Sequence, residues 1–250
     1  MRYFIELSFK GTNYFGWQIQ PDAPTVQEKL NSSLSLLLRQ EIEVVGAGRT
    51  DSGVHANFMV AHFDSKSIAS IEKLKHRLNS LLPDDIVVNC IFVVKPDAHA
   101  RFDAESRSYI YRIILGRNPF DLETTWQIHN RSFDVSLMNE ACKVLLKHRD
   151  FKAFSKSKTD VKTYECVIFD AEWCLEENHL SFKISANRFL RNMVRAIVGT
   201  MLEVGEGNMS IDDFENVVLS RNRSNAGKSV PARGLYLSDI KYPDKKIYGK

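Results

Sequence analysis

The segment whose residue types could do chemistry is a glycine-rich turn at residues 46–56, which reads Gly-Ala-Gly-Arg-Thr-Asp-Ser-Gly-Val-His-Ala. Three glycines in its first eight residues let the backbone turn sharply and approach a ligand closely. Arg49 and Asp51 are two positions apart, so in an extended stretch their side chains point the same way. A carboxylate placed like Asp51 can act as a nucleophile or as a general base.

Two other interpretations of this turn are open. In a plain Asp-x-Gly turn, Asp51 would bond only to its own backbone. In a dinucleotide-binding fingerprint, Asp51 would stand where the third glycine belongs and would repel a pyrophosphate. The turn also leads into a predicted strand rather than a helix, which argues against the dinucleotide interpretation.

A second segment with chemical potential is residues 188–204, which the apolar spacing predicts to be a helix. At about 100° per residue, Arg188, Arg191 and Arg195 would share a narrow arc, with Gly199 on the same side. No acidic residue stands three or four positions away within 187–199 to neutralise them. Such a face suits a phosphate backbone or a buried carboxylate, although a solvated basic face is the ordinary alternative.

A third segment is the predicted strand at residues 105–116. Arg107, Tyr109 and Tyr111 alternate onto one face, where an aromatic ring beside an arginine can stack on a nucleobase. A cross-strand aromatic pair that supports the sheet is the alternative.

Two basic segments, 155–162 and 221–233, are predicted to be mobile loops that bind phosphates or merely aid solubility. Their neighbourhoods hold Lys152, Lys156, Lys158 and Lys162, and Arg221, Arg223, Lys228 and Arg233.

The elements that must position these segments follow a repeated order. Hydrophobic alternation, helical periodicity and the Thr25-x-x-Glu28 capping box predict strand, helix, two strands, helix and strand at 2–9, 25–39, 42–47, 57–64, 67–82 and 86–94. The same order is predicted at 105–116, 135–147, 161–174, 179–186, 188–204 and 235–241. The fold class is therefore α+β, with two ferredoxin-like halves whose antiparallel sheets carry packed helices. The predicted halves are residues 1–100, with the aspartate turn, and 101–250, with the tyrosine strand and arginine helix.

Composition narrows the classes of protein. The chain has 250 residues, of which 44% are hydrophobic and 26% charged, as is ordinary for a folded protein. Four cysteines without a Cys-x-x-Cys pair predict free thiols in a reducing cytoplasm, and the seven histidines show no ligand spacing, so no metal site is predicted. No apolar run is long enough for a membrane span, and the N-terminus reads as a strand rather than a signal peptide.

Taken together, these segments resemble the tRNA pseudouridine synthase A (TruA) family over nearly the whole chain. The matching motifs stand in the family's order, at residues 14–18 with 25–27, 48–56, 102–104 with 109–111, 150–154, 186–199 and 231–235. Departures are small, with Ser52 in place of a common alanine, and Phe58 and Met59 in place of a frequent Gly-Gln pair.

The resemblance implies roles for individual residues. Asp51 would be the essential carboxylate, Arg195 its partner, and Tyr109 the residue against the target base. Arg49 would help hold the nucleotide out of its stack. Arg188 and Arg191 are predicted to bind the substrate because of their place on the cationic helix face, not because of the resemblance.

The resemblance also implies two RRM-like halves around an active-site cleft and a homodimer that acts without a cofactor. Its substrates would be uridines 38, 39 and 40 in the anticodon stem-loop of tRNA. A non-catalytic RNA-binding module would also explain the arginines and Tyr109, but it gives no reason for Asp51 in a tight glycine turn. A dinucleotide-dependent enzyme is a third alternative.

Overall fold

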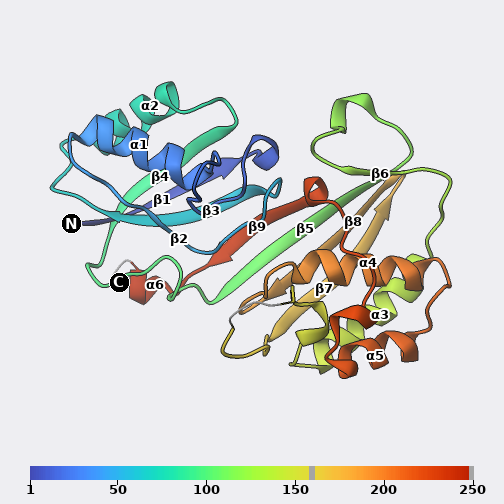
Figure 1. The fold of residues 1–250 in the computed structure, drawn as a ribbon. Coiled ribbons are helices and arrows are strands. Elements are labelled where there is room, and N and C mark those ends of the chain that lie inside the picture. The colour runs from blue at the N-terminus through green and yellow to red at the C-terminus, as the bar shows by residue number, and fades with distance from the viewer. Residues whose placement is uncertain (158–160, 248–250) are drawn as a thin grey trace. The chain divides into compact units, whose positions relative to one another are not determined.

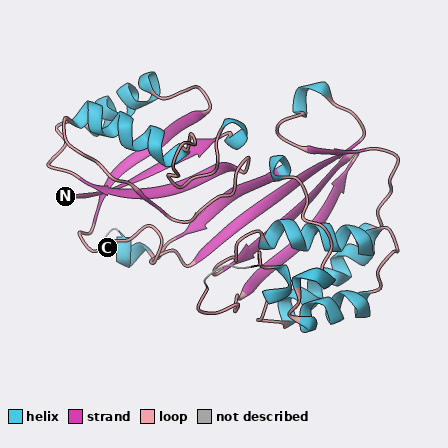
Figure 2. Cartoon of the chain, in the orientation of Figure 1, coloured by secondary structure: helices cyan, strands magenta, loops and turns pink. Residues whose placement is uncertain are grey.

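The computed structural model describes residues 1–157 and 161–247. The chain forms two compact units. Unit 1 comprises Met1–Ser106 together with the chain from Tyr236 onward, and unit 2 comprises Arg107–Leu235. In both units, helices pack on strands that are mostly antiparallel, so the fold class is α+β, as the sequence predicts (Figures 1 and 2).

Unit 1 has the predicted order of strand, helix, two strands, helix and strand. Its elements are β1 (Arg2–Phe9), α1 (Val26–Leu38), β2 (Val45–Gly46), β3 (His55–Asp64), α2 (Ile71–Leu81) and β4 (Ile86–Val94). The strands lie in the order β4-β1-β3, with β1 antiparallel to both neighbours, and β2 also pairs with β3. The final elements β9 (Leu235–Lys241) and α6 (Asp244–Ile247) follow unit 2 in the sequence.

The core of unit 1 follows from the alternation in β1. Ile5, Leu7 and Phe9, which alternate along the strand, are buried. Phe4, on the other face of the strand, is buried as well, because its ring packs against Phe92 and Tyr242. Helix α1 begins where the capping box places it, since the Thr25 hydroxyl accepts the Glu28 N–H at 3.4 Å.

Among its described residues, unit 2 has a strand hydrogen-bonded to a hairpin, a short parallel strand and three α-helices. Its elements are β5 (Ser106–Leu115), β6 (Trp126–Ile128), α3 (Val135–Lys147), β7 (Ile168–Glu176), β8 (His179–Ala186), α4 (Met193–Gly205) and α5 (Ile211–Ser220). The order is β5-β8-β7, all antiparallel, and the short β6 runs parallel to β5. Helix α3 packs on β7 and against α4 and α5.

The structure differs from the sequence prediction at the boundary between the halves. Strand β9 was predicted as the last strand of the second half, but Tyr236 and the residues after it belong to unit 1. The reason is pairing, since β9 runs parallel to β3 with His55 opposite Tyr236 and Ala56 opposite Leu237.

Two elements of unit 2 also differ. Strand β7 begins at Ile168 rather than at 161, because residues 164–166 pair with 149–151 instead; the Phe151 N–H donates to the Tyr164 carbonyl at 3.1 Å. Helix α5 was not predicted, although Ser210 and Asp213 form a capping box that marks its start. In the part of the chain that the structure describes, no helix has both the length and the apolar character needed to cross a membrane.

Candidate functional site

The glycine-rich turn connects β2 to β3 in unit 1. At its start, the Ala47 N–H donates to the Val60 carbonyl at 2.8 Å. At its end, the Val54 N–H donates to the Asp51 carbonyl at 3.1 Å, and Gly53 takes a φ of +76°. Asp51 is half-buried and Arg49 is exposed, so both residues lie on one turn that is tied to the sheet on either side.

Residues 11–17 brace this turn from outside. The Gly53 N–H donates to the Tyr14 carbonyl at 3.2 Å, and the Trp17 N–H donates to the Thr50 carbonyl at 3.4 Å. Gly16 has a φ of +94°, and a Cβ there would lie only 2.3 Å from the Thr50 carbonyl oxygen. Glycine therefore permits a backbone-to-backbone contact that locates the residue directly before Asp51.

Further contacts hold the brace in place. The buried Trp17 indole lies against Gly46, where a Cβ would be 2.5 Å from Nε1. The Gln27 side chain, on α1, donates to the Val44 carbonyl at 2.7 Å and accepts the Ile19 N–H at 2.9 Å. The start of α1, the segment before β2 and the brace are thereby linked. The sequence prediction missed this positioning function of residues 14–17.

The hydroxyl of Tyr14 anchors the other end of the brace. It donates to Asp85 at 2.5 Å. Burial, together with this hydrogen bond, raises the pKa of Tyr14 far above its ordinary value, so the hydroxyl stays protonated and remains a donor.

His55, next to the turn, is a positioning residue. It is buried, its Nδ1 accepts the Gly11 N–H at 2.9 Å, and its ring stacks on Tyr236 with the centroids 4.7 Å apart. These contacts fix the start of β3 against residue 11 and β9. The structure thus gives His55 a clear supporting function beside Asp51.

In unit 2, the three aromatic and basic residues on the face of β5 have different environments. Tyr111 is fully buried, and its hydroxyl donates to the Pro231 carbonyl at 2.8 Å, so it belongs to the core. Arg107 donates to the Asn187 carbonyl at 3.0 Å. Tyr109 is half-buried and meets the ring of Phe189 edge to face, with the centroids 5.0 Å apart and the planes at 85°. Tyr109 alone of the two tyrosines keeps part of its surface accessible.

Arg195 lies in the first turn of α4 and is half-buried. Its Nε donates to the Val230 carbonyl at 2.7 Å, and the Val230 N–H donates back to the Arg195 carbonyl at 3.2 Å. These two bonds orient the guanidinium of Arg195 on the backbone of the segment that precedes β9. The charge of Arg195 also acts on Tyr111. Burial raises the pKa of Tyr111 far above its ordinary value, and the charges of Arg195 and Arg233 oppose that shift.

The prediction of one helical face shared by three arginines is wrong for two of them. Helix α4 begins only at Met193, so Arg188 and Arg191 lie in the loop before it. The backbone of this loop is not helical, because Asn192 takes a φ of +66°. The Arg191 carbonyl accepts the Lys156 N–H at 3.0 Å instead of an N–H of the helix. Arg188 is half-buried and Arg191 is exposed.

The sequence predicts a mobile loop at 221–233, but this segment is bound along α4. A Cβ on Gly199 would lie 1.8 Å from the Lys228 carbonyl oxygen, so the group that approaches this glycine is the chain's own backbone. The Gly227 N–H donates to the Thr200 hydroxyl at 2.9 Å. Arg223 donates to the carbonyls of Ala226 and Gly227 and to the Ser229 hydroxyl.

The other basic segment is described only in part. Lys158 lies outside the described residues. Lys152 stands over the ring of Tyr164, with its Nζ 5.4 Å from the centroid. Arg221, from the second basic segment, forms an ion pair with Asp150 at 3.1 Å. The structure therefore brings residues 150–154, which precede the first basic segment, close to the second basic segment.

Comparison with known proteins identifies the family. The family model described as tRNA pseudouridine synthase matches residues 7–103 and 141–243. A tRNA pseudouridine synthase A from Parabacteroides distasonis is 51% identical over 245 residues, covering 98% of this chain and 97% of that protein. The proteins of the same name from Bacteroides fragilis and Bacillus licheniformis are 50% and 39% identical, covering 98% and 97% of this chain and 97% and 99% of their own lengths. The chain therefore belongs to the tRNA pseudouridine synthase family.

Proposed function

We propose that this chain isomerises uridine to pseudouridine at positions 38, 39 and 40, in the anticodon stem-loop of tRNA, with Asp51 as the essential carboxylate. The observation that carries the proposal is a full-length family match in which Asp51 stands on a turn braced by residues 11–17. A reacting group must be held in one geometry to be effective, and this brace supplies that constraint.

The reaction breaks the bond between sugar C1′ and base N1, turns the base, and forms a bond between C1′ and C5. It transfers neither electrons nor a phosphoryl group, so the proposal invokes no cofactor. The Asp51 carboxylate would act either as a nucleophile or as a base at the sugar. Both functions need the ionised form, which burial disfavours and an opposite charge favours.

Arg195 is proposed to be the residue that keeps Asp51 ionised. Its planar guanidinium can contact a carboxylate through two N–H groups. The Nε bond to the Val230 carbonyl supports this proposal, since it leaves the outer end of the guanidinium oriented by the fold rather than by a flexible side chain. The return bond from the Val230 N–H keeps that carbonyl in place.

The target base must leave its stack, at a cost of a few kcal/mol. Tyr109 is proposed to lie against the everted base, and stacking would return about 1–3 kcal/mol. The edge-to-face contact with Phe189 supports this proposal because it holds the Tyr109 ring in one orientation. Exposed Arg49 is proposed to help hold the nucleotide, and Arg188 and Arg191 to bind substrate phosphates.

Two further properties complete the proposal. The enzyme would work as a homodimer in the cytoplasm, where its tRNA substrate is found. Sedimentation of the purified protein tests the first property, because a monomer at micromolar concentration would contradict it.

Mapping of pseudouridine by mass spectrometry tests the function directly. A tRNA transcript is incubated with purified protein, without added cofactor, and with the variants Asp51→Asn and Asp84→Asn. Asp84 is an exposed carboxylate of the same unit, so its replacement is a matched control for the loss of one charge. We expect wild type and Asp84→Asn to modify positions 38–40, and Asp51→Asn to bind tRNA but form no pseudouridine.

Two outcomes count against the proposal. Isomerisation by Asp51→Asn at the wild-type rate would exclude Asp51 as the essential group. Tight tRNA binding by the wild-type protein with no modification of any uridine would favour a non-catalytic RNA-binding module.

A further inference from the structure

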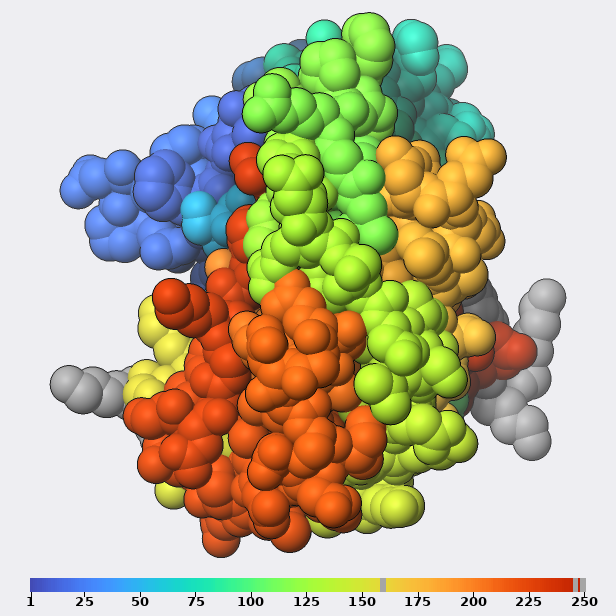
Figure 3. Space-filling model, turned by 90° about the vertical axis from the view of Figure 1, so that its right-hand side faces the viewer, coloured from blue at the N-terminus to red at the C-terminus, as the bar shows by residue number. Residues whose placement is uncertain are grey.

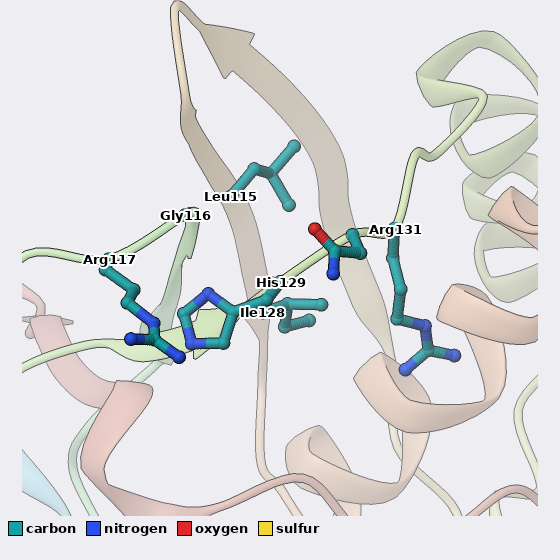
Figure 4. Close-up of a pocket in the computed structure, with 7 residues that line it drawn as sticks. Leu115, Gly116, Arg117, Ile128, His129 and Arg131 are labelled. Atoms are coloured by element: carbon teal, nitrogen blue, oxygen red, sulfur yellow. The ribbon is translucent and has the colours of Figure 1, made fainter.

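A pocket of about 460 Å³ lies in unit 2, where β5 and β6 end. Residues 115–117 line one side and residues 128–131 the other (Figure 4). The backbone here takes two left-handed conformations, with φ of +143° at Gly116 and +54° at Asn130. Figure 3 shows that the segment containing these residues, coloured green to yellow-green, reaches the surface.

The lining of this pocket is cationic. It includes Arg117, His129 and Arg131 and no acidic residue. Arg131 is engaged elsewhere, because it forms a short ion pair with Glu206 through both Nε and an outer nitrogen. Arg117 and His129 project to the same side of the pocket, while Arg131 extends away from them (Figure 4). Arg117 has no acidic partner within 4.0 Å among residues 1–157 and 161–247, so its charge is available to an anion.

The loop that leaves the pocket presents an aromatic ring to solvent. Phe120 is 92% exposed, the largest exposed fraction among the large apolar residues of the described chain. The loop that carries it is nevertheless held by hydrogen bonds. The Asn118 side chain accepts the Phe120 N–H at 3.0 Å, and Gln127 bonds to both the N–H and the carbonyl of Asn118.

The Asp121 side of the loop is fixed as well. The Asp121 carbonyl accepts the Thr125 hydroxyl at 3.0 Å and the Thr125 N–H at 3.0 Å. A rigid loop that keeps a large apolar ring in water forgoes the stabilisation that burial of the ring would give the fold. The ring is therefore held in one place with its face open to solvent, as stacking on a nucleobase requires.

We infer that this pocket and Phe120 form a second tRNA contact, in which Arg117 and His129 bind a backbone phosphate and the Phe120 ring stacks on an unpaired base. Charge and chemistry select this occupant, because a guanidinium beside an imidazole binds phosphate oxygens and an exposed ring stacks on any base. The inference rests on the proposed function, since it takes tRNA as the substrate.

The length of β5 places this contact away from the target base. Tyr109 and Leu115 are six residues apart on one strand, and a strand rises about 3.3 Å per residue. The pocket therefore lies about 20 Å from Tyr109. An A-form RNA duplex rises less per base pair than the 3.4 Å of B-form DNA, so that distance spans at least about six base pairs. The second contact would thus reach parts of the tRNA outside the anticodon stem-loop.

Binding measurements on two RNAs test this inference. A full-length tRNA transcript and the isolated anticodon stem-loop are titrated with wild type, Arg117→Gln and Phe120→Ala at several salt concentrations. For the full-length tRNA, we expect Kd to rise about 5-fold or more in each variant. We also expect the slope of log K against log salt to fall by about 1 for Arg117→Gln, as one phosphate contact is lost. For the stem-loop, both variants should bind like wild type.

Matched controls separate a specific contact from general changes of the surface. Leu122→Ala removes another exposed apolar side chain of the same loop, and Lys143→Gln removes an exposed charge from α3. Both should leave Kd within about 2-fold of wild type, as is usual for surface residues away from a contact.

The inference is overturned if Arg117→Gln binds full-length tRNA as tightly as wild type. It is also overturned if both RNAs lose affinity equally, because the contact would then lie inside the stem-loop. Pseudouridine formation is scored separately on the wild-type protein. Failure of that assay rejects the proposed function, while the Kd ratios still decide whether the pocket binds tRNA.

Discussion

Gly16 faces the carbonyl oxygen of Thr50 so closely that a Cβ on Gly16 would lie 2.3 Å from that oxygen. The contact is between two backbone segments that are far apart in sequence, and it sets the position of the residue before Asp51. The side chain of Thr50 takes no part in this contact, and Gly16 has none. The brace therefore depends on the absence of a side chain at position 16.

Replacement of Gly16 tests this brace. Gly16→Ala adds a Cβ where there is no room and where the φ of +94° already disfavours one, so the turn must shift. A displacement of about 1 Å at a reacting group can cost about 100-fold in rate, and we expect a loss of kcat of that order with tRNA binding retained. Single-turnover assays measure the effect.

Gly48 provides the matched control. It belongs to the same turn, and a Cβ there would meet nothing within 4 Å. Gly48→Ala should therefore keep nearly the wild-type rate. Equal rates for the two variants would show that the contact between Gly16 and Thr50 does not position Asp51.

Replacement of Arg195 by lysine separates charge from geometry. Lysine keeps the positive charge but has no Nε to donate to the Val230 carbonyl, and it cannot make a two-pronged contact with a carboxylate. We expect Arg195→Lys to lose at least 10-fold in kcat, the effect of about 1.4 kcal/mol of transition-state stabilisation. Arg77→Lys, at an exposed position on α2, is the control and should not change kcat. Wild-type kcat in Arg195→Lys would mean that charge alone suffices.

The stability of the protein should depend on pH through His62. Burial, with the charges of His99 and Arg2, lowers the pKa of His62 to about 4. Unfolded histidine has a pKa of about 6.5, so between pH 6.5 and 4 the unfolded chain binds a proton that the native state excludes. The free energy of unfolding therefore falls as the pH drops below about 6.5. The loss from this residue is at most about 2 kcal/mol at pH 5.

Urea unfolding at pH 7.5 and pH 5 measures this dependence. His62→Gln retains an acceptor for the Ala100 N–H, which bonds to the His62 Nδ1 at 3.2 Å, but it does not titrate. The difference between the two pH values should shrink in this variant, with a remainder from His99, whose pKa burial also lowers. In the control His76→Gln, at an exposed position, the difference should remain as in wild type. An undiminished difference in His62→Gln would contradict the assignment.

Local sequence determined most of the secondary structure and the catalytic candidate. The Thr25 capping box, the alternation of Ile5, Leu7 and Phe9, and the apolar run at 86–94 each act over a few neighbouring residues, so they are readable without a fold. The Arg49-Thr50-Asp51 turn was equally local, since it closes at Gly53, whose φ of +76° few other residues adopt. Family motifs then supplied the proposed functions of these residues, which spacing alone left open.

Tertiary contacts decided the features that the sequence did not determine. Helical periodicity would have carried α4 back to Arg188, but the Arg191 carbonyl bonds to the Lys156 N–H. Polar composition predicted a mobile segment at 221–233, yet Gly199 admits its backbone against α4. Strand β9 joined unit 1 through its pairing with β3. In each case backbone groups bond to partners from distant parts of the chain. Buried N–H and C=O groups must form hydrogen bonds wherever the fold places them. Their partners are therefore known only from the folded structure.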